Sequence, residues 1–193
     1  MGLVRVTAPA TTPVTLAEAK KHCRAEDFTD DDVLITLYIE AATAYLDGEE
    51  GVLGKALVNQ VWDLFWDEFP DGPIELPLPP LSSVNFVKYY DSDNVLTTLD
   101  PNEYAVDIRS GVGYVVPSVD GWPASYADTI NAVNVRYVAG YGTAENVPAA
   151  LKAAILLMVG DLYATRETVV VGQAIAESRT TELLLRPYRR MFV

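Results

Sequence analysis

Hydrophobic and polar positions follow two different periods along this chain of 193 residues. Over residues 16–47 and 148–170 the apolar residues recur every three to four positions, which is the period of a helix. Between these segments, short apolar runs are separated by Pro, Gly and Asp, as is typical of strands joined by tight turns. The pattern predicts an α+β fold, in which residues 15–50 and 147–170 form a helical assembly body and residues 56–142 form an inserted antiparallel β subdomain. Residues 1–14 are expected to be an extended arm, and residues 171–193 a tail that can form a short helix.

The first helical segment carries clear signals for where helices begin. Thr15 and Glu18 have the spacing of a capping box, so a short helix is expected from Leu16 to about residue 24. Residues 25–28 are expected to be a loop. Thr29 is then the expected cap of a second helix, with the acidic residues 30–32 in its first turn, where carboxylates complement the positive end of the helix dipole.

The second helix has an unusually narrow polar side. Its polar residues lie on one stripe, and about two-thirds of the circumference is apolar at 3.6 residues per turn. Two packing partners are therefore expected, one within the chain and one in another subunit; the alternative is a central helix wrapped by the chain's own strands. The interface residues expected on this helix and on the C-terminal helix are Leu34, Leu37, Tyr38, Ile39, Tyr45, Leu156 and Tyr163.

The middle of the chain is predicted to be a series of strands. Residues 56–69 place Trp62, Leu64 and Trp66 on one side, with Asp63 and Asp67 on the other, solvated side. Further strands are expected at 74–76, 84–90, 95–99, 104–108, 113–116 and 132–138, with a turn at 91–94. Their regular spacing favours an antiparallel sheet or a small barrel.

The formal net charge of −13 is unevenly distributed. Residues 166–193 carry a net charge of +2, so the first 165 residues carry −15. Such an acidic body disfavours specific or tight binding to the phosphate backbone of DNA. One cysteine excludes an intrachain disulfide and suits a reducing cytoplasm. The longest apolar run, residues 153–160, is too short to cross a bilayer.

Few residues have the types and spacing that catalysis or cofactor binding requires. The lone histidine, His22, precedes the lone cysteine, Cys23, and adjacent helical positions do not face each other. Asp63 and Asp67 would lie about 13 Å apart along a strand, too far for a glycosidase pair. We therefore expect no enzyme, no catalytic residue, no metal and no cofactor. A sugar-binding face that includes Trp62 remains as an alternative.

Several short motifs follow one another along the chain: VTLAEAK at 14–20, DDD at 30–32, IELPLPPLSSV at 74–84, WP at 122–123, VRYVAGYG at 135–142, VP at 147–148 and YATRE at 163–167. Taken together and in this order, they resemble the phage head–tail connector (head completion or adaptor) family. The resemblance covers nearly the whole chain except its C-terminal part from residue 169.

This resemblance implies a structural virion protein at the capsid–tail junction, made in the cytoplasm of the bacterial host. Such proteins form a homo-oligomeric ring, usually a dodecamer, below the portal protein, and they accept a tail, stopper or head-closure protein. Genomic DNA passes through the acidic channel without specific binding, and no membrane is involved. The residues expected to dock on the portal are Arg179, Arg186, Tyr188, Arg189, Arg190 and Phe192. The alternative function is a carbohydrate- or receptor-binding tail module that uses the β subdomain.

Overall fold

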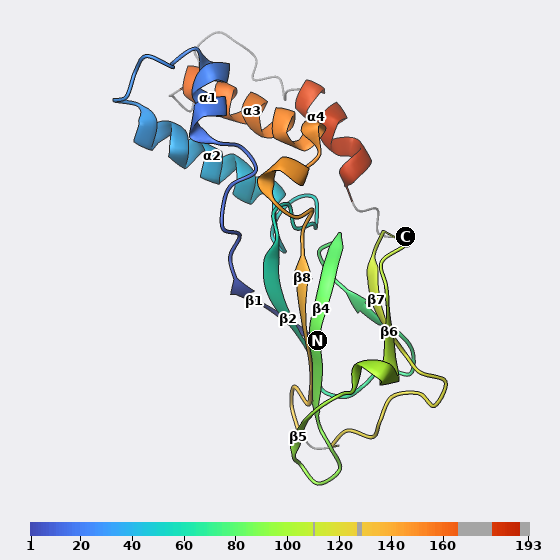
Figure 1. Ribbon diagram of the computed structural model, residues 1–193. Coiled ribbons are helices and arrows are strands. Elements are labelled where there is room, and N and C mark those ends of the chain that lie inside the picture. The colour runs from blue at the N-terminus through green and yellow to red at the C-terminus, as the bar shows by residue number, and fades with distance from the viewer. Residues whose placement is uncertain (110, 127–128, 166–178, 190–193) are drawn as a thin grey trace. The chain divides into compact units, whose positions relative to one another are not determined.

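The computed structural model describes residues 1–109, 111–126, 129–165 and 179–189 (Figure 1). The chain forms two compact units, which are considered separately. The β unit comprises Met1–Ala10 and Val58–Gly142, and the helical unit comprises Thr11–Leu57 and Thr143–Val193. Helices and antiparallel sheets are thus segregated, and the predicted α+β class is confirmed.

The helical unit is organised around its C-terminal long helix. Its helices are α1 (Leu16–Cys23), α2 (Asp32–Leu46), α3 (Ala149–Ala164) and α4 (Arg179–Leu185), with short 3₁₀ turns η2 (Ala144–Asn146) and η3 (Arg186–Tyr188). Helix α3 packs against each of the other three, and α1 also packs against α2. The core consists of Ala19, Ile35, Ile39, Ala42, Leu46, Leu151, Ala154, Ile155, Val159 and Leu185. None of the described helices is long and apolar enough to cross a bilayer.

The capping box at the start of α1 is confirmed. The Thr15 amide donates to the Glu18 carboxylate at 2.7 Å, and the Glu18 amide donates to the Thr15 hydroxyl at 3.2 Å. The expected cap of α2 is wrong, because the helix begins three residues after Thr29. Residues 29–32 form a turn in which the Asp32 amide donates to the Thr29 carbonyl at 3.1 Å, so Asp31 is the N-cap.

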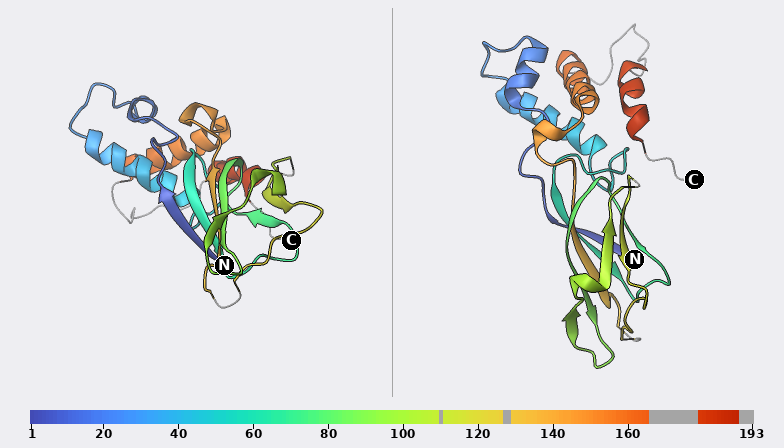
Figure 2. Two further views of the ribbon diagram at one scale, coloured as in Figure 1. Left: turned by 60° about the horizontal axis from the view of Figure 1, so that its bottom comes forward. Right: turned by 45° about the vertical axis from the view of Figure 1, so that its right-hand side comes forward.

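The β unit contains two open antiparallel sheets (Figures 1 and 2). The larger has the order β1-β2-β8-β4-β5, built from Gly2–Thr7, Gln60–Trp66, Val133–Ala139, Leu81–Tyr90 and Leu96–Thr98. The smaller has the order β3-β7-β6, built from Ile74–Leu76, Gly113–Pro117 and Tyr104–Asp107, with the 3₁₀ turn η1 (Pro101–Glu103) before β6. Every strand expected from the sequence is present to within a few residues, and the sheet rather than the barrel is confirmed.

The first residues of the chain are extended, as expected, but they form an edge strand. Strand β1 pairs with β2 in antiparallel register, with Leu3 opposite Leu64. A bulge lies between Arg5 and Thr7. The Pro/Thr-rich composition of residues 1–14 concealed this strand, because Pro9 and Pro13 interrupt the segment although Val4, Val6 and Thr7 are β-branched residues of the kind that mark strands.

Strand β2 shows why strict alternation fails as a guide to burial here. Trp62 and Leu64 are buried on one side as expected, but Asp63 on the other side is only 5% exposed. Its carboxylate accepts two hydrogen bonds from Arg136 on β8, each 2.7 Å long. The expectation of a solvated Asp63 is therefore wrong, because an arginine on the neighbouring strand satisfies the buried charge.

Candidate functional site

Helix α2 carries two apolar faces, and the helical unit buries only one of them. The buried face consists of Ile35, Ile39, Ala42 and Leu46, which face the core. The exposed face consists of residues four positions apart, which lie one above the other on a helix. We call it the α2 stripe: Val33, Leu37, Ala41 and Tyr45.

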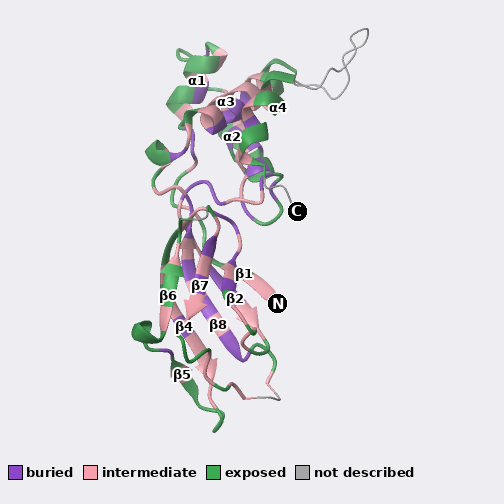
Figure 3. Cartoon of the chain, turned by 90° about the vertical axis from the view of Figure 1, so that its right-hand side faces the viewer, coloured by how far each residue is buried: buried purple, intermediate pink, exposed green. Residues whose placement is uncertain are grey.

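The exposure of the α2 stripe is large for apolar side chains; Figure 3 colours α2 and the other elements by burial. Val33 is 84% exposed, Leu37 is 56% exposed and Tyr45 is 51% exposed. Single exposed apolar residues are ordinary, but a contiguous row on one helix marks an interaction surface. Within the helical unit the α2 stripe is left uncovered, because the other helices pack against the opposite, buried face of α2.

The other residues expected at an intersubunit interface occupy different environments. Leu34 and Tyr38 on α2 are half-buried, as is Leu156 on α3. Ile39 is only 3% exposed, so its side chain belongs to the core and leaves little surface for a second subunit. The Tyr163 hydroxyl donates to the Asp31 carboxylate at 2.7 Å, a contact that ties the end of α3 to the start of α2.

The basic C-terminal segment offers a second, smaller surface. Arg179, Arg186 and Arg189 are exposed, and Tyr188 is half-buried. Arg189 lies 3.8 Å from the Glu182 carboxylate in an exposed ion pair, which contributes little to stability. Arg190 and Phe192, the other two expected docking residues, lie outside the described residues.

Charge is strongly biased in the β unit. Its sequence holds twelve Asp and Glu residues against four Lys and Arg residues, a net charge of −8. One of the four bases, Arg136, is committed to Asp63 by the two hydrogen bonds across the sheet. The hydrogen bonds to Asp63 raise the pKa of the Arg136 guanidinium, so the guanidinium keeps its positive charge. The β unit therefore presents a negative surface to any partner.

The described residues give no support to chemistry at His22 or Cys23. No group of three or more His, Cys, Asp or Glu residues within the described ranges could hold a metal ion. Burial raises the pKa of the Cys23 thiol, which disfavours the reactive thiolate.

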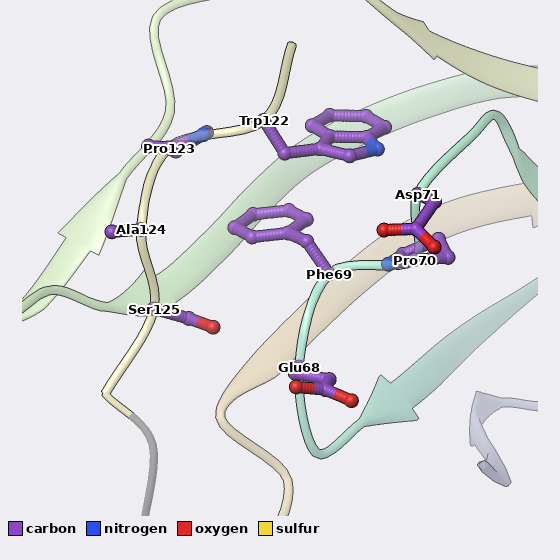
Figure 4. Close-up of a pocket in the computed structure, with 8 residues that line it drawn as sticks. All are labelled: Glu68, Phe69, Pro70, Asp71, Trp122, Pro123, Ala124 and Ser125. Carbon is purple, nitrogen blue, oxygen red and sulfur yellow. The ribbon is translucent and has the colours of Figure 1, made fainter.

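The β unit has one further feature that sequence reasoning missed, a shallow pocket at one end of the β2–β3 loop (Figure 4). The rings of Phe69 and Trp122 stack there, with centroids 4.8 Å apart and planes within 9°. The Trp122 indole donates to the Gly72 carbonyl at 2.8 Å. The two rings come from segments more than fifty residues apart in sequence, so no local pattern reveals the pair. Trp62, by contrast, is 4% exposed and is not available to stack on a sugar.

Comparison with known proteins bears on the segment that contains the α2 stripe and on the fold of the whole chain. Residues 13–106 match the sequence profile of the phage gp6-like head–tail connector proteins. The resemblance read from the ordered motifs is thereby confirmed for the matched part of the chain, which contains the whole α2 stripe. No curated protein sequence matches the chain.

Solved structures extend the likeness in fold to the full chain. A chain from the neck of an empty gene transfer agent particle, computed with C6 symmetry, superposes with a TM-score of 0.82 at 24% identity, over 100% of this chain and 97% of that one. A chain from the virion of a native gene transfer agent particle gives 0.80 at 23% identity with the same coverage. A chain from the native neck, computed with C12 symmetry, gives 0.72 at 23% identity, again with the same coverage.

Proposed function

We propose that this protein is a structural head–tail connector that assembles as a homo-oligomeric ring at the junction of capsid and tail. The observation that carries the proposal is the exposed α2 stripe, which lies inside the segment that matches the connector family. The fold shared with neck chains of gene transfer agent particles supports the same location. The symmetry of those necks supports a closed ring, and we propose twelve copies.

In the proposed ring, the α2 stripe of one subunit packs on a different surface of the next subunit. Such a heterologous contact closes when its rotation divides the full circle. Burying a Leu or Val side chain contributes about 1.5–3 kcal/mol relative to full exposure, so each half-exposed residue of the stripe would contribute about 1 kcal/mol. The edge of this interface would be formed by three residues that are half-buried in the protomer, Leu34, Tyr38 and Leu156.

The remaining parts of the proposal concern the partners at either end of the ring. The basic segment with Arg179, Arg186, Tyr188 and Arg189 would dock on the portal protein, and a tail, stopper or head-closure protein would bind the opposite side. The acidic character of the chain would let genomic DNA pass through the ring without adhering to it, since like charges repel phosphates. A buried Trp62 speaks against the alternative sugar-binding module built on that residue.

A single substitution on the stripe tests the proposed contact. Leu37→Glu places a charge at its centre and should abolish ring formation, because an unpaired charge would be buried against the next subunit. Thr36→Glu is the matched control, since it adds the same charge at the neighbouring exposed position of the same helix. Light scattering of the purified proteins reads out assembly, and complementation of a particle lacking the gene reads out attachment of tails. Normal assembly by the Leu37→Glu protein would remove the α2 stripe from the interface.

A further inference from the structure

The pocket at the end of β2 combines features that the connector proposal does not use. It is lined by Glu68, Phe69, Pro70, Asp71, Trp122, Pro123, Ala124 and Ser125 and has a volume of about 390 Å³. Figure 4 shows the Trp122 indole lying over the Phe69 ring, with the Asp71 carboxylate beside the two rings. The two prolines fix the backbone on both sides of the pocket, because each locks its own φ angle.

The aromatic part of the pocket is held rigidly. Phe69 stacks on Trp122 and also packs against Tyr89 of β4, with ring centroids 5.4 Å apart. The hydrogen bond from the Trp122 indole to the Gly72 carbonyl fixes the indole plane. One face of the indole is therefore covered by Phe69. A preorganised aromatic surface of this kind is what cations and planar groups stack on.

Among the residues that the structure describes, none acts as a counterion for the charged part of the pocket. Glu68 and Asp71 are both exposed, and neither has a hydrogen-bond or ion-pair partner within the described ranges. Nearby carboxylates already influence a ring in the cluster, since burial and then the negative charges of Glu103 and Asp91 raise the pKa of Tyr89. The local field is negative, in keeping with the net charge of the whole β unit.

We propose that this pocket binds an arginine side chain presented by a protein partner. A guanidinium combines a planar face, which stacks on an indole, with forked donors, which match carboxylates. A lysine ammonium supplies the charge without the planar face. A saccharide hydroxyl could donate to these carboxylates, but a saccharide carries no positive charge to balance them, whereas a guanidinium does.

The pocket can be tested without knowing the partner, by NMR titration with N-acetyl-arginine methylamide. The reporter is the indole N–H signal of Trp122, assigned with a Trp122→Phe variant. We expect a saturating shift with a dissociation constant on the order of millimolar, as befits one side chain. N-acetyl-citrulline methylamide, which has the same shape without the charge, should give no saturating shift.

Variants connect the response to the two carboxylates. Glu68→Gln with Asp71→Asn should weaken arginine binding about fivefold to tenfold, because two exposed charge pairs are lost. Asp93→Asn with Glu50→Gln removes the same charge from exposed residues that do not line the pocket and should leave binding unchanged.

Three results would overturn the proposal: equal responses to the arginine and citrulline compounds, no response up to about 50 mM, far above a millimolar constant, or a saturating response to methyl glycosides instead. None of these results bears on ring assembly, so this proposal and the connector proposal fail separately.

Discussion

The ion pair across β2 and β8 makes an asymmetric prediction about stability. The Asp63 side chain is 8% exposed, whereas that of Arg136 is 34% exposed. Arg136→Met therefore strands a buried carboxylate, while Asp63→Asn leaves a guanidinium that water still reaches. Removing one partner of a fully buried ion pair lowers the free energy of unfolding by about 3–5 kcal/mol. Because one partner of this pair is a third exposed, we expect Arg136→Met to lower it by about 2–3 kcal/mol. For Asp63→Asn, which keeps an acceptor oxygen, we expect about 1 kcal/mol.

Urea denaturation at one protein concentration measures this difference. The midpoints should shift while the slope stays constant, because the surface exposed on unfolding hardly changes. Lys88→Met is the control: Lys88 and Arg136 both lie over the Phe86 ring, at 4.6 Å and 5.0 Å, but Lys88 is not paired with Asp63. The Lys88→Met substitution should lower the free energy of unfolding by no more than about 1 kcal/mol. The reasoning is refuted if Asp63→Asn costs as much as Arg136→Met, or if Arg136→Met costs no more than the control.

Two further predictions concern local structure. Two hydrogen bonds lower the pKa of Glu18 from its ordinary 4.5, the larger effect coming from the Thr15 amide and the smaller from the Thr15 hydroxyl. The capping box should therefore stabilise the folded protein above pH 4.5. This stabilisation should be lost as the pH falls through the lowered pKa. Urea midpoints of the wild type and Glu18→Gln should accordingly differ at pH 7 and converge at acidic pH, and a constant difference would contradict this reading. Gly140 has φ +135°, and a Cβ there would lie 2.6 Å from the Asn59 amide nitrogen, so Gly140→Ala should destabilise by about 3 kcal/mol or more. Gly72→Ala, which meets nothing within 4 Å, should shift the thermal midpoint little, and equal effects of the two alanines would refute the argument.

The sequence predicted most elements because their signals are local. The capping box of Thr15 and Glu18, the alternation within strands and the turns between them all depend on neighbours a few residues away. The start of α2 was misplaced for the same reason, since residues 29–32 contain several residues that can cap a helix and only the backbone turn decides among them.

Contacts between distant segments could not be predicted from one sequence. Asp63 and Arg136 are 73 residues apart, and their pairing depends on β2 and β8 becoming neighbours in the sheet. The stack of Phe69 on Trp122 is equally non-local. The apolar excess of α2 was visible in the sequence, but which face the core buries depends on how α1 and α3 pack on it. The sequence pattern therefore predicts an interface position for Ile39, whereas its side chain lies in the core.

The central claim, assembly into a ring that joins the portal, is tested most directly by the native mass of the purified chain, alone and mixed with the portal protein of its particle. The protomer mass is 21.1 kDa, so a ring of twelve has a mass of about 253 kDa. We predict this mass, or a complex in which twelve copies join the portal, and we predict its loss in the Leu37→Glu protein. A protein that stays monomeric both alone and with portal would contradict the account.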